Sequence, residues 1–240
     1  MLIFGGIILI FLLFVYPFQD IKYTKKVKET GNWEEKREYF LFIMKSEWFL
    51  TFLILIGAAA FSVSWTEFGL KIPNENTSKL LGMFLGFIIG VLFLVLVLFR
   101  LPFYKKRMDK QMENISFLAP ANKRERNWGL ASSVTAGICE EIIYRGFVIF
   151  YLQSLPFDLS LPVVLVLSAL IFGFGHIYQG WKGFLLTSFL GFVFARVYVM
   201  TDSLLFPIIL HIIIDARFFL MQKLKNENHD NVHQEFKNLI

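Results

Sequence analysis

The run LIFGGIILIFLLFVYPF, residues Leu2–Phe18, decides the class of fold because it holds no charged side chain. A helix that crosses a bilayer needs about 20 predominantly apolar residues, within a range of roughly 17–25. The run has no basic segment ahead of it and no small-x-small cleavage site after it, unlike a secretory signal peptide. We therefore interpret Leu2–Phe18 as a retained membrane anchor.

Further apolar runs meet the same criterion, and together they predict an all-α, polytopic transmembrane helix bundle of about seven spans. These runs are Trp48–Ser64, Leu80–Phe103, Gly129–Tyr151, Leu161–His176, Gly183–Met200 and Leu204–Met221. Hydrophobic residues make up 56% of the 240 residues and charged residues 18%, whereas soluble domains average about 25% charged. This balance excludes both a soluble globular domain and a disordered chain.

Lysine and arginine are concentrated in alternate loops, which predicts how the spans are oriented. Basic residues cluster between the first two spans and again after the third, whereas the intervening loops hold only Lys71 and Lys79. Because Lys and Arg are retained on the cytoplasmic side, we expect the N-terminus outside and the C-terminal tail in the cytoplasm. This topology accounts for the net charge of +5 without a nucleic-acid partner. A composition rich in Lys, Ile, Asn and Phe favours a bacterial plasma membrane.

Ionisable side chains inside a bilayer cost several kcal/mol, so their positions point to function. The interiors of the first three predicted spans hold none. The last four spans hold Glu140, Glu141, Arg145, His176, Arg196, His211, Asp215 and Arg217. We therefore divide the chain into N-terminal anchor spans (1–128), a chemically active helix bundle (129–221) and a polar cytoplasmic tail (222–240). The stretch Asp20–Glu47 is expected to be either an amphipathic interfacial helix or a solvated loop.

The segment CEEIIYR, Cys139–Arg145, places a carboxylate and a guanidinium four residues apart. On a helix Glu141 and Arg145 share one face in the favourable order, and in a low-dielectric setting we expect them to pair as ions. Glu140 points about 100° away and gains no such partner from its own helix. A buried carboxyl group without a cationic partner suits a general acid or base. The alternative is a structural, ion-paired helix.

Two histidines lie on later apolar segments. His176 ends the run FGFGH, and His211 shares a helix face with Asp215, which can hold one imidazole tautomer. With a rise of about 1.5 Å per residue, Glu140 and His211 each lie roughly 15 Å from the cytoplasmic boundary, with His176 nearer to it. We therefore expect these polar groups to meet in one cavity that opens to the cytoplasm.

Three short motifs follow one another on successive apolar segments between about Gly129 and Met221. They are Glu140-Glu141-x-x-x-Arg145, Phe172-x-x-x-His176 and His211-x-x-x-Asp215. In this order they resemble the CPBP family, the CAAX protease and bacteriocin-processing group of intramembrane proteases. The family is also called Abi and includes the Ras-converting CAAX prenyl endopeptidase.

The resemblance implies a role for each motif residue. Glu140 and His176 would activate the hydrolytic water, and His211 and Asp215 would bind or orient the oxyanion of the tetrahedral intermediate. Prenyl-protein proteases typically carry Asn where this chain has Asp215. Since an ionised Asp cannot donate a hydrogen bond, Asp215 either is protonated or supports His211. The resemblance also implies a supporting pair, Glu141 and Arg145.

The resemblance leaves open whether the chemistry uses a metal. A metal-free pair of Glu and His is favoured, so no cofactor is expected. The alternative is zinc held by two histidines and one carboxylate, which would be Glu140, His176 and His211. The single cysteine, Cys139, excludes a cysteine-based zinc site and an intrachain disulfide.

The expected function is an intramembrane endopeptidase that acts on membrane-associated peptides or protein tails, of the CAAX type or of the bacteriocin and leader type. Its partners would be membrane lipids and a membrane-anchored substrate, and its oligomeric state is not predicted. A non-catalytic bacteriocin self-immunity or scaffold protein is the alternative. A proton-coupled transporter is less favoured, because the chain lacks an internal repeat and its ionisable groups form one cluster.

Overall fold

The computed structural model describes residues 1–73, 82, 86, 90, 113–222 and 224. Every regular element within these ranges is a helix, which confirms the predicted all-α bundle. The predicted span Leu80–Phe103 and the tail beyond residue 224 lie almost entirely outside the described residues.

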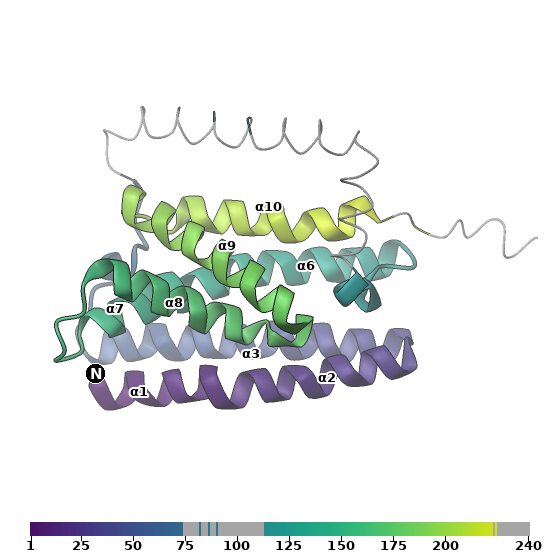
Figure 1. The fold of residues 1–240 in the computed structure, drawn as a ribbon, viewed down its shortest axis with the longest axis horizontal. Helices are drawn as coiled ribbons and strands as arrows, with labels where there is room; N and C mark the ends of the chain where they lie inside the picture. The colour runs from purple at the N-terminus through teal and green to yellow at the C-terminus, as the bar shows by residue number, and fades with distance from the viewer. Residues whose placement is uncertain (74–81, 83–85, 87–89, 91–112, 223, 225–240) are drawn as a thin grey trace, which may run out of the picture.

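The N-terminal part forms a helical hairpin (Figure 1). Its elements are α1 (Leu2–Ile10), the π-helix η1 (Phe11–Val15), α2 (Tyr16–Thr30) and α3 (Trp33–Ala60). The chain reverses at Gly31, which has a left-handed φ of 61° and donates its N–H to Val27 O at 2.8 Å. Asn32 then caps α3 by accepting the N–H of Glu35 at 2.9 Å. A glycine after a helix and an asparagine before one are common stop and start signals.

The hairpin corrects both readings of the stretch Asp20–Glu47. This stretch is neither a separate interfacial helix nor a solvated loop, because it forms the adjoining ends of α2 and α3. Its charged residues form the polar C-terminal part of α2 and the polar N-terminal part of α3, which continue the apolar parts of these helices. The polar composition was interpreted as a break in the helices, whereas the break is confined to Gly31 and Asn32.

The remaining helices pack onto this hairpin. They are η2 (Trp65–Phe68), η3 (Glu113–Leu118), α6 (Lys123–Glu140), η4 (Glu141–Val148), α7 (Ile149–Gln153), α8 (Leu161–Gly175), η5 (Ile177–Gln179), α9 (Gly180–Thr201) and α10 (Leu205–Met221). In Figure 1, α3, α6 and α10 lie one above another over α1 and α2, and α8 and α9 cross in front of them. The chain runs without a break from α6 through the π-helix η4 into α7.

Two glycines allow helices to cross closely. A Cβ on Gly137 of α6 would lie 2.4 Å from Ile212 Cγ1 of α10, and one on Gly173 of α8 would lie 1.9 Å from Ser188 Oγ of α9. Small residues have this role at helix contacts within membranes. The close crossings bring α10 against α6 and α9 against α8, next to the segments that carry the motif residues.

Three described helices are long and apolar enough to cross a membrane, namely Leu2–Thr30, Trp33–Ala60 and Ile177–Thr201. Helix α8 is apolar but shorter. The total of about seven spans stays a prediction, because part of the chain lies outside the described residues.

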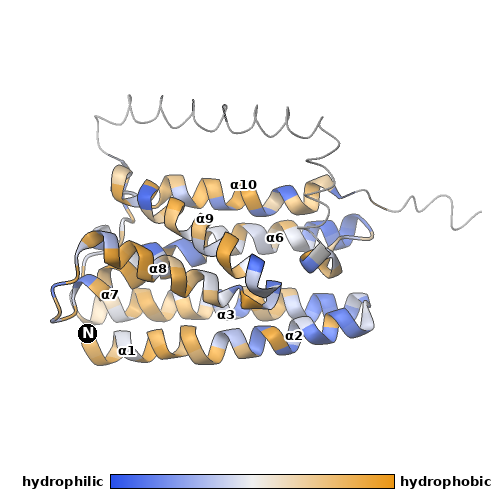
Figure 2. Ribbon diagram, viewed as in Figure 1, coloured by the Kyte–Doolittle hydropathy of each residue, from blue (hydrophilic) through white to orange (hydrophobic). Residues whose placement is uncertain are grey.

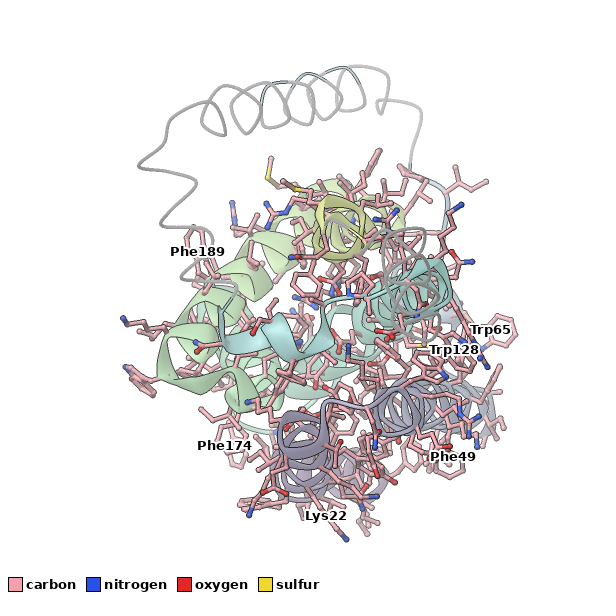
Figure 3. All side chains as sticks on the ribbon, turned by 90° about the vertical axis from the view of Figure 1, so that its right-hand side faces the viewer. Lys22, Phe49, Trp65, Trp128, Phe174 and Phe189 are labelled. Carbon is pink, nitrogen blue, oxygen red and sulfur yellow. The ribbon has the colours of Figure 1, made fainter. Side chains whose placement is uncertain are left out.

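The surface of the bundle is that of an integral membrane protein. Figure 2 shows hydrophobic residues along most of the helices, whereas the neighbouring ends of α2, α3 and α6 are hydrophilic. Large apolar side chains such as Phe49 and Phe189, 69% and 63% exposed, project outward (Figure 3). Because such exposure is unfavourable in water, these faces are suited to contact with lipid. Which end of the bundle faces the cytoplasm stays a prediction.

Candidate active site

The two adjacent glutamates lie where the helix changes its geometry. Glu140 is the last residue of α6 and Glu141 is the first of the π-helix η4. Short π-helical segments inside α-helices are frequent at functional sites. Both carboxyl groups are buried, with Glu140 6% and Glu141 0% exposed. The sequence therefore buries two neighbouring acids that leave the helix in different directions.

The expected ion pair of Glu141 and Arg145 is present, and Arg145 also contacts neighbouring helices. Arg145 Nη1 donates to Glu141 Oε1 at 2.9 Å, and Nη2 donates to Gly191 O of α9 at 3.3 Å. The guanidinium also lies over the rings of Phe172 and Phe194, at 4.2 and 5.2 Å from their centroids. A buried guanidinium is stabilised both by a carboxylate and by aromatic faces. Arg145 thereby ties η4 to α8 and α9.

Glu141 also contacts His211, and this contact was not predicted from the sequence. His211 Nδ1 lies 2.7 Å from Glu141 Oε1, the oxygen that already accepts from Arg145. The other nitrogen, Nε2, lies 3.6 Å from Glu140 Oε2 and 3.5 Å from Asp215 Oδ2. The tautomer-holding role expected for Asp215 therefore falls to Glu141. Asp215, four residues further along the same helix, approaches the ring on its Nε2 side.

His176 approaches Glu140 from the end of α8. Its Nδ1 lies 3.0 Å from Phe172 O, and a carbonyl oxygen only accepts hydrogen bonds. The network therefore assigns the proton to Nδ1 and a lone pair to Nε2. Nε2 lies 4.0 Å from Glu140 Oε2. Glu140 thus faces one ring nitrogen from each histidine, and the structure brings the four predicted catalytic residues together.

These groups line a cavity of about 570 Å³. Its volume falls within the roughly 300–1,000 Å³ of binding sites for small ligands. Side chains that sequence reasoning did not place at the site also line it: Tyr16, Asp20, Tyr39, Glu47, Lys182 and Arg217. Asp20 and Glu47 bound the stretch that was expected to be an interfacial helix or a solvated loop. The signal that could have placed them was the pair Gly31-Asn32, which turns one long helix back along another.

The predicted zinc ligands do not form a metal-binding group. Across the residues that the structure describes, no three His, Cys, Asp or Glu side chains are placed to hold a metal ion. Glu140 Oε2 lies 4.0 Å from Nε2 of His176 and 3.6 Å from Nε2 of His211, whose Nδ1 contacts Glu141. The hydrolytic steps of the proposed function are therefore assigned to side chains of this chain alone.

A known protein family matches the part of the chain that contains these site residues. Residues 125–217 match the family model described as type II CAAX prenyl endopeptidase Rce1-like. All six residues of the charged and polar motifs fall inside this range. No curated protein and no solved structure matches the chain. The match confirms the resemblance to the CAAX proteases: residues 125–217 are similar to the Rce1-like, type II CAAX prenyl endopeptidases, a family of proteases.

Proposed function

We propose that this chain is an intramembrane endopeptidase that hydrolyses a peptide bond near the end of a membrane-anchored protein or peptide. The observation that carries the proposal is the position of Glu140 in the cavity. Its Oε2 has no hydrogen-bond partner among the described residues, and it faces Nε2 of His176 and Nε2 of His211. A buried carboxyl group between two imidazoles is suited to proton transfer.

Water activation follows from the 4.0 Å between Glu140 Oε2 and His176 Nε2. Both atoms are acceptors, so one water at about 2.8 Å from each can donate one O–H to each. As the water oxygen bonds to the substrate carbonyl carbon, one of its protons passes to Glu140. When the C–N bond breaks, Glu140 returns that proton to the leaving amine nitrogen. Glu140 is therefore the base in the first step and the acid in the second.

The oxyanion is stabilised by His211. Its Nδ1–H donates to Glu141 Oε1 at 2.7 Å, which fixes the ring and directs Nε2 into the cavity. In its doubly protonated form, His211 donates from Nε2 to the oxygen that gains negative charge. Asp215, with a side chain 39% exposed, lies beside the same nitrogen and stabilises the charged ring. Arg145 acts on this chemistry only through Glu141.

The substrate class follows from the family and from the surface. The family model describes prenyl endopeptidases, which favours a CAAX-type tail over a bacteriocin or leader peptide. A lipid-anchored tail can approach along the apolar faces of the bundle and enter the cavity. From the distribution of Lys and Arg, we place the cavity opening on the cytoplasmic side of a bacterial plasma membrane, with the N-terminus outside.

The test compares wild type with Glu140→Ala in lipid vesicles, on a library of prenylated and unprenylated peptides analysed by mass spectrometry. Asp158→Asn, in the exposed connection between α7 and α8, is the matched control. We expect wild type and the control to cleave a prenylated peptide and Glu140→Ala to leave it intact. Equal cleavage by Glu140→Ala would contradict the role of Glu140. Binding without cleavage by any form would instead favour an immunity or scaffold protein.

A further inference from the structure

A third buried carboxyl group reaches the active site from outside the family-matched range. Glu47 of α3 is 4% exposed and lines the same cavity as Glu140. Its side chain lies within hydrogen-bonding reach of that of Glu140. Neither Glu47 Oε2 nor Glu140 Oε2 has a hydrogen-bond partner among the described residues. The N-terminal hairpin, predicted to form membrane-anchor spans, thus places a carboxyl group beside the central acid of the site.

A purely structural role does not account for Glu47. Buried acids in a core are normally paired with a cation, because an unpaired buried charge is costly. Within the described ranges, the ion pairs of the site join Glu140, Glu141 and Asp215 to His or Arg, and none includes Glu47. An apolar side chain at this position would pack on α6 without that cost. What Glu47 supplies and an apolar residue does not is its contact with Glu140.

The chemistry of that contact fixes which group donates. An ionised carboxylate only accepts hydrogen bonds, so two carboxyl groups in contact need one proton between them. Glu140 must be free to accept a proton from water, which makes Glu47 the donor. A hydrogen bond from Glu47 would hold the Glu140 carboxylate in one orientation, with Oε2 toward the two histidines.

We propose that Glu47 is a positioning residue, which donates a hydrogen bond to Glu140 and holds it toward His176 and His211. The proposal rests on the proposed hydrolytic function. It makes the catalytic centre composite, because the family-matched range 125–217 would be incomplete without α3. It also gives the α2–α3 hairpin a part in the reaction in addition to membrane anchoring.

The kinetic test uses two substitutions that differ in one property. Glu47→Gln keeps an N–H donor for Glu140, and Glu47→Leu removes it. We expect Glu47→Leu to lower kcat about 30-fold or more with KM within about threefold, and Glu47→Gln to stay within about fivefold of wild type. Glu38→Leu, the same change at an exposed position of α3, is the control. Full activity of Glu47→Leu, or equal losses in Glu47→Gln and Glu47→Leu, would overturn the proposal.

An infrared measurement tests the hydrogen bond without relying on catalysis. The carbonyl stretch of a protonated carboxyl group is distinct from the bands of a carboxylate, so the shared proton should be visible in the full-length protein. We expect a protonated-carboxyl band in wild type that is lost in Glu47→Gln and kept in Glu38→Leu. An unchanged band in Glu47→Gln would overturn the proposal even if the protein is a protease. Loss of the band in a protein that cleaves no peptide would contradict only the hydrolytic function.

Discussion

Replacing Glu141 by glutamine tests the contact that links η4 to α10 at the site. Glu141 Oε1 accepts from Arg145 Nη1 at 2.9 Å and from His211 Nδ1 at 2.7 Å. Glu141 is 0% and Arg145 1% exposed, so water does not compensate the loss of either bond. Glutamine keeps the size and shape of the side chain and removes its charge. The change therefore isolates the electrostatic part of the contact.

The expected loss of stability can be estimated in two ways. Two hydrogen bonds to a charged group, at about 1.5–3 kcal/mol each, give about 3–6 kcal/mol. Removing one partner of a buried ion pair costs about 3–5 kcal/mol, because the other charge stays buried. The two estimates agree, and we expect Glu141→Gln to lower the free energy of unfolding by about 3–5 kcal/mol.

The assay is reversible unfolding of the purified protein in mixed micelles, followed by circular dichroism. Arg145→Met and the double variant complete a cycle, and Asp158→Asn is the control. Because Glu141→Gln leaves Arg145 buried and unpaired, the double variant should be less destabilised than the sum of the single variants, by about 1–3 kcal/mol. A loss below about 1 kcal/mol for Glu141→Gln, or strictly additive losses, would refute this account of the pair.

Three further predictions address other parts of the structure. His176→Phe should keep the fold and lower kcat by about 10²–10⁴, measured on a cleaved peptide, and unchanged kcat would exclude His176 from proton transfer. Lys36→Met should lower the free energy of unfolding by about 3–5 kcal/mol, because it leaves the buried Glu125 without the Lys36 ammonium group 3.0 Å away. Adding Glu125→Gln should restore part of that loss. Gly173→Val should lower the melting temperature, since its Cβ would meet Ser188 Oγ, and an unchanged value would show that α8 and α9 separate easily.

The sequence predicted the parts of the site that depend on one helix. Residues four apart share a face, which is why the contacts of Glu141 with Arg145 and of His211 with Asp215 could be expected. Counting helical rise from the membrane boundary also placed Glu140 and His211 at a similar depth. Their convergence followed from that depth and from the cost of leaving ionisable groups in lipid.

Contacts between helices were beyond such reasoning. That Glu141 holds His211 depends on the crossing of α10 over α6 at Gly137, which sequence spacing does not specify. Glu47 was missed for a different reason, because the polar stretch that it ends was interpreted as an interfacial helix or a solvated loop. The turn signals at Gly31 and Asn32 were present in the sequence and predict the hairpin that brings Glu47 to the cavity.

The central claim is that Glu140 accepts a proton from a water molecule as that water attacks the carbonyl carbon of a peptide bond. The most direct measurement follows cleavage of a prenylated peptide in ¹⁸O-labelled water by mass spectrometry, for wild type and Glu140→Gln in lipid vesicles. The account predicts that wild type places one ¹⁸O atom in the new carboxyl group, and that Glu140→Gln does so at least about 10²-fold more slowly. Cleavage by Glu140→Gln at the wild-type rate would contradict it.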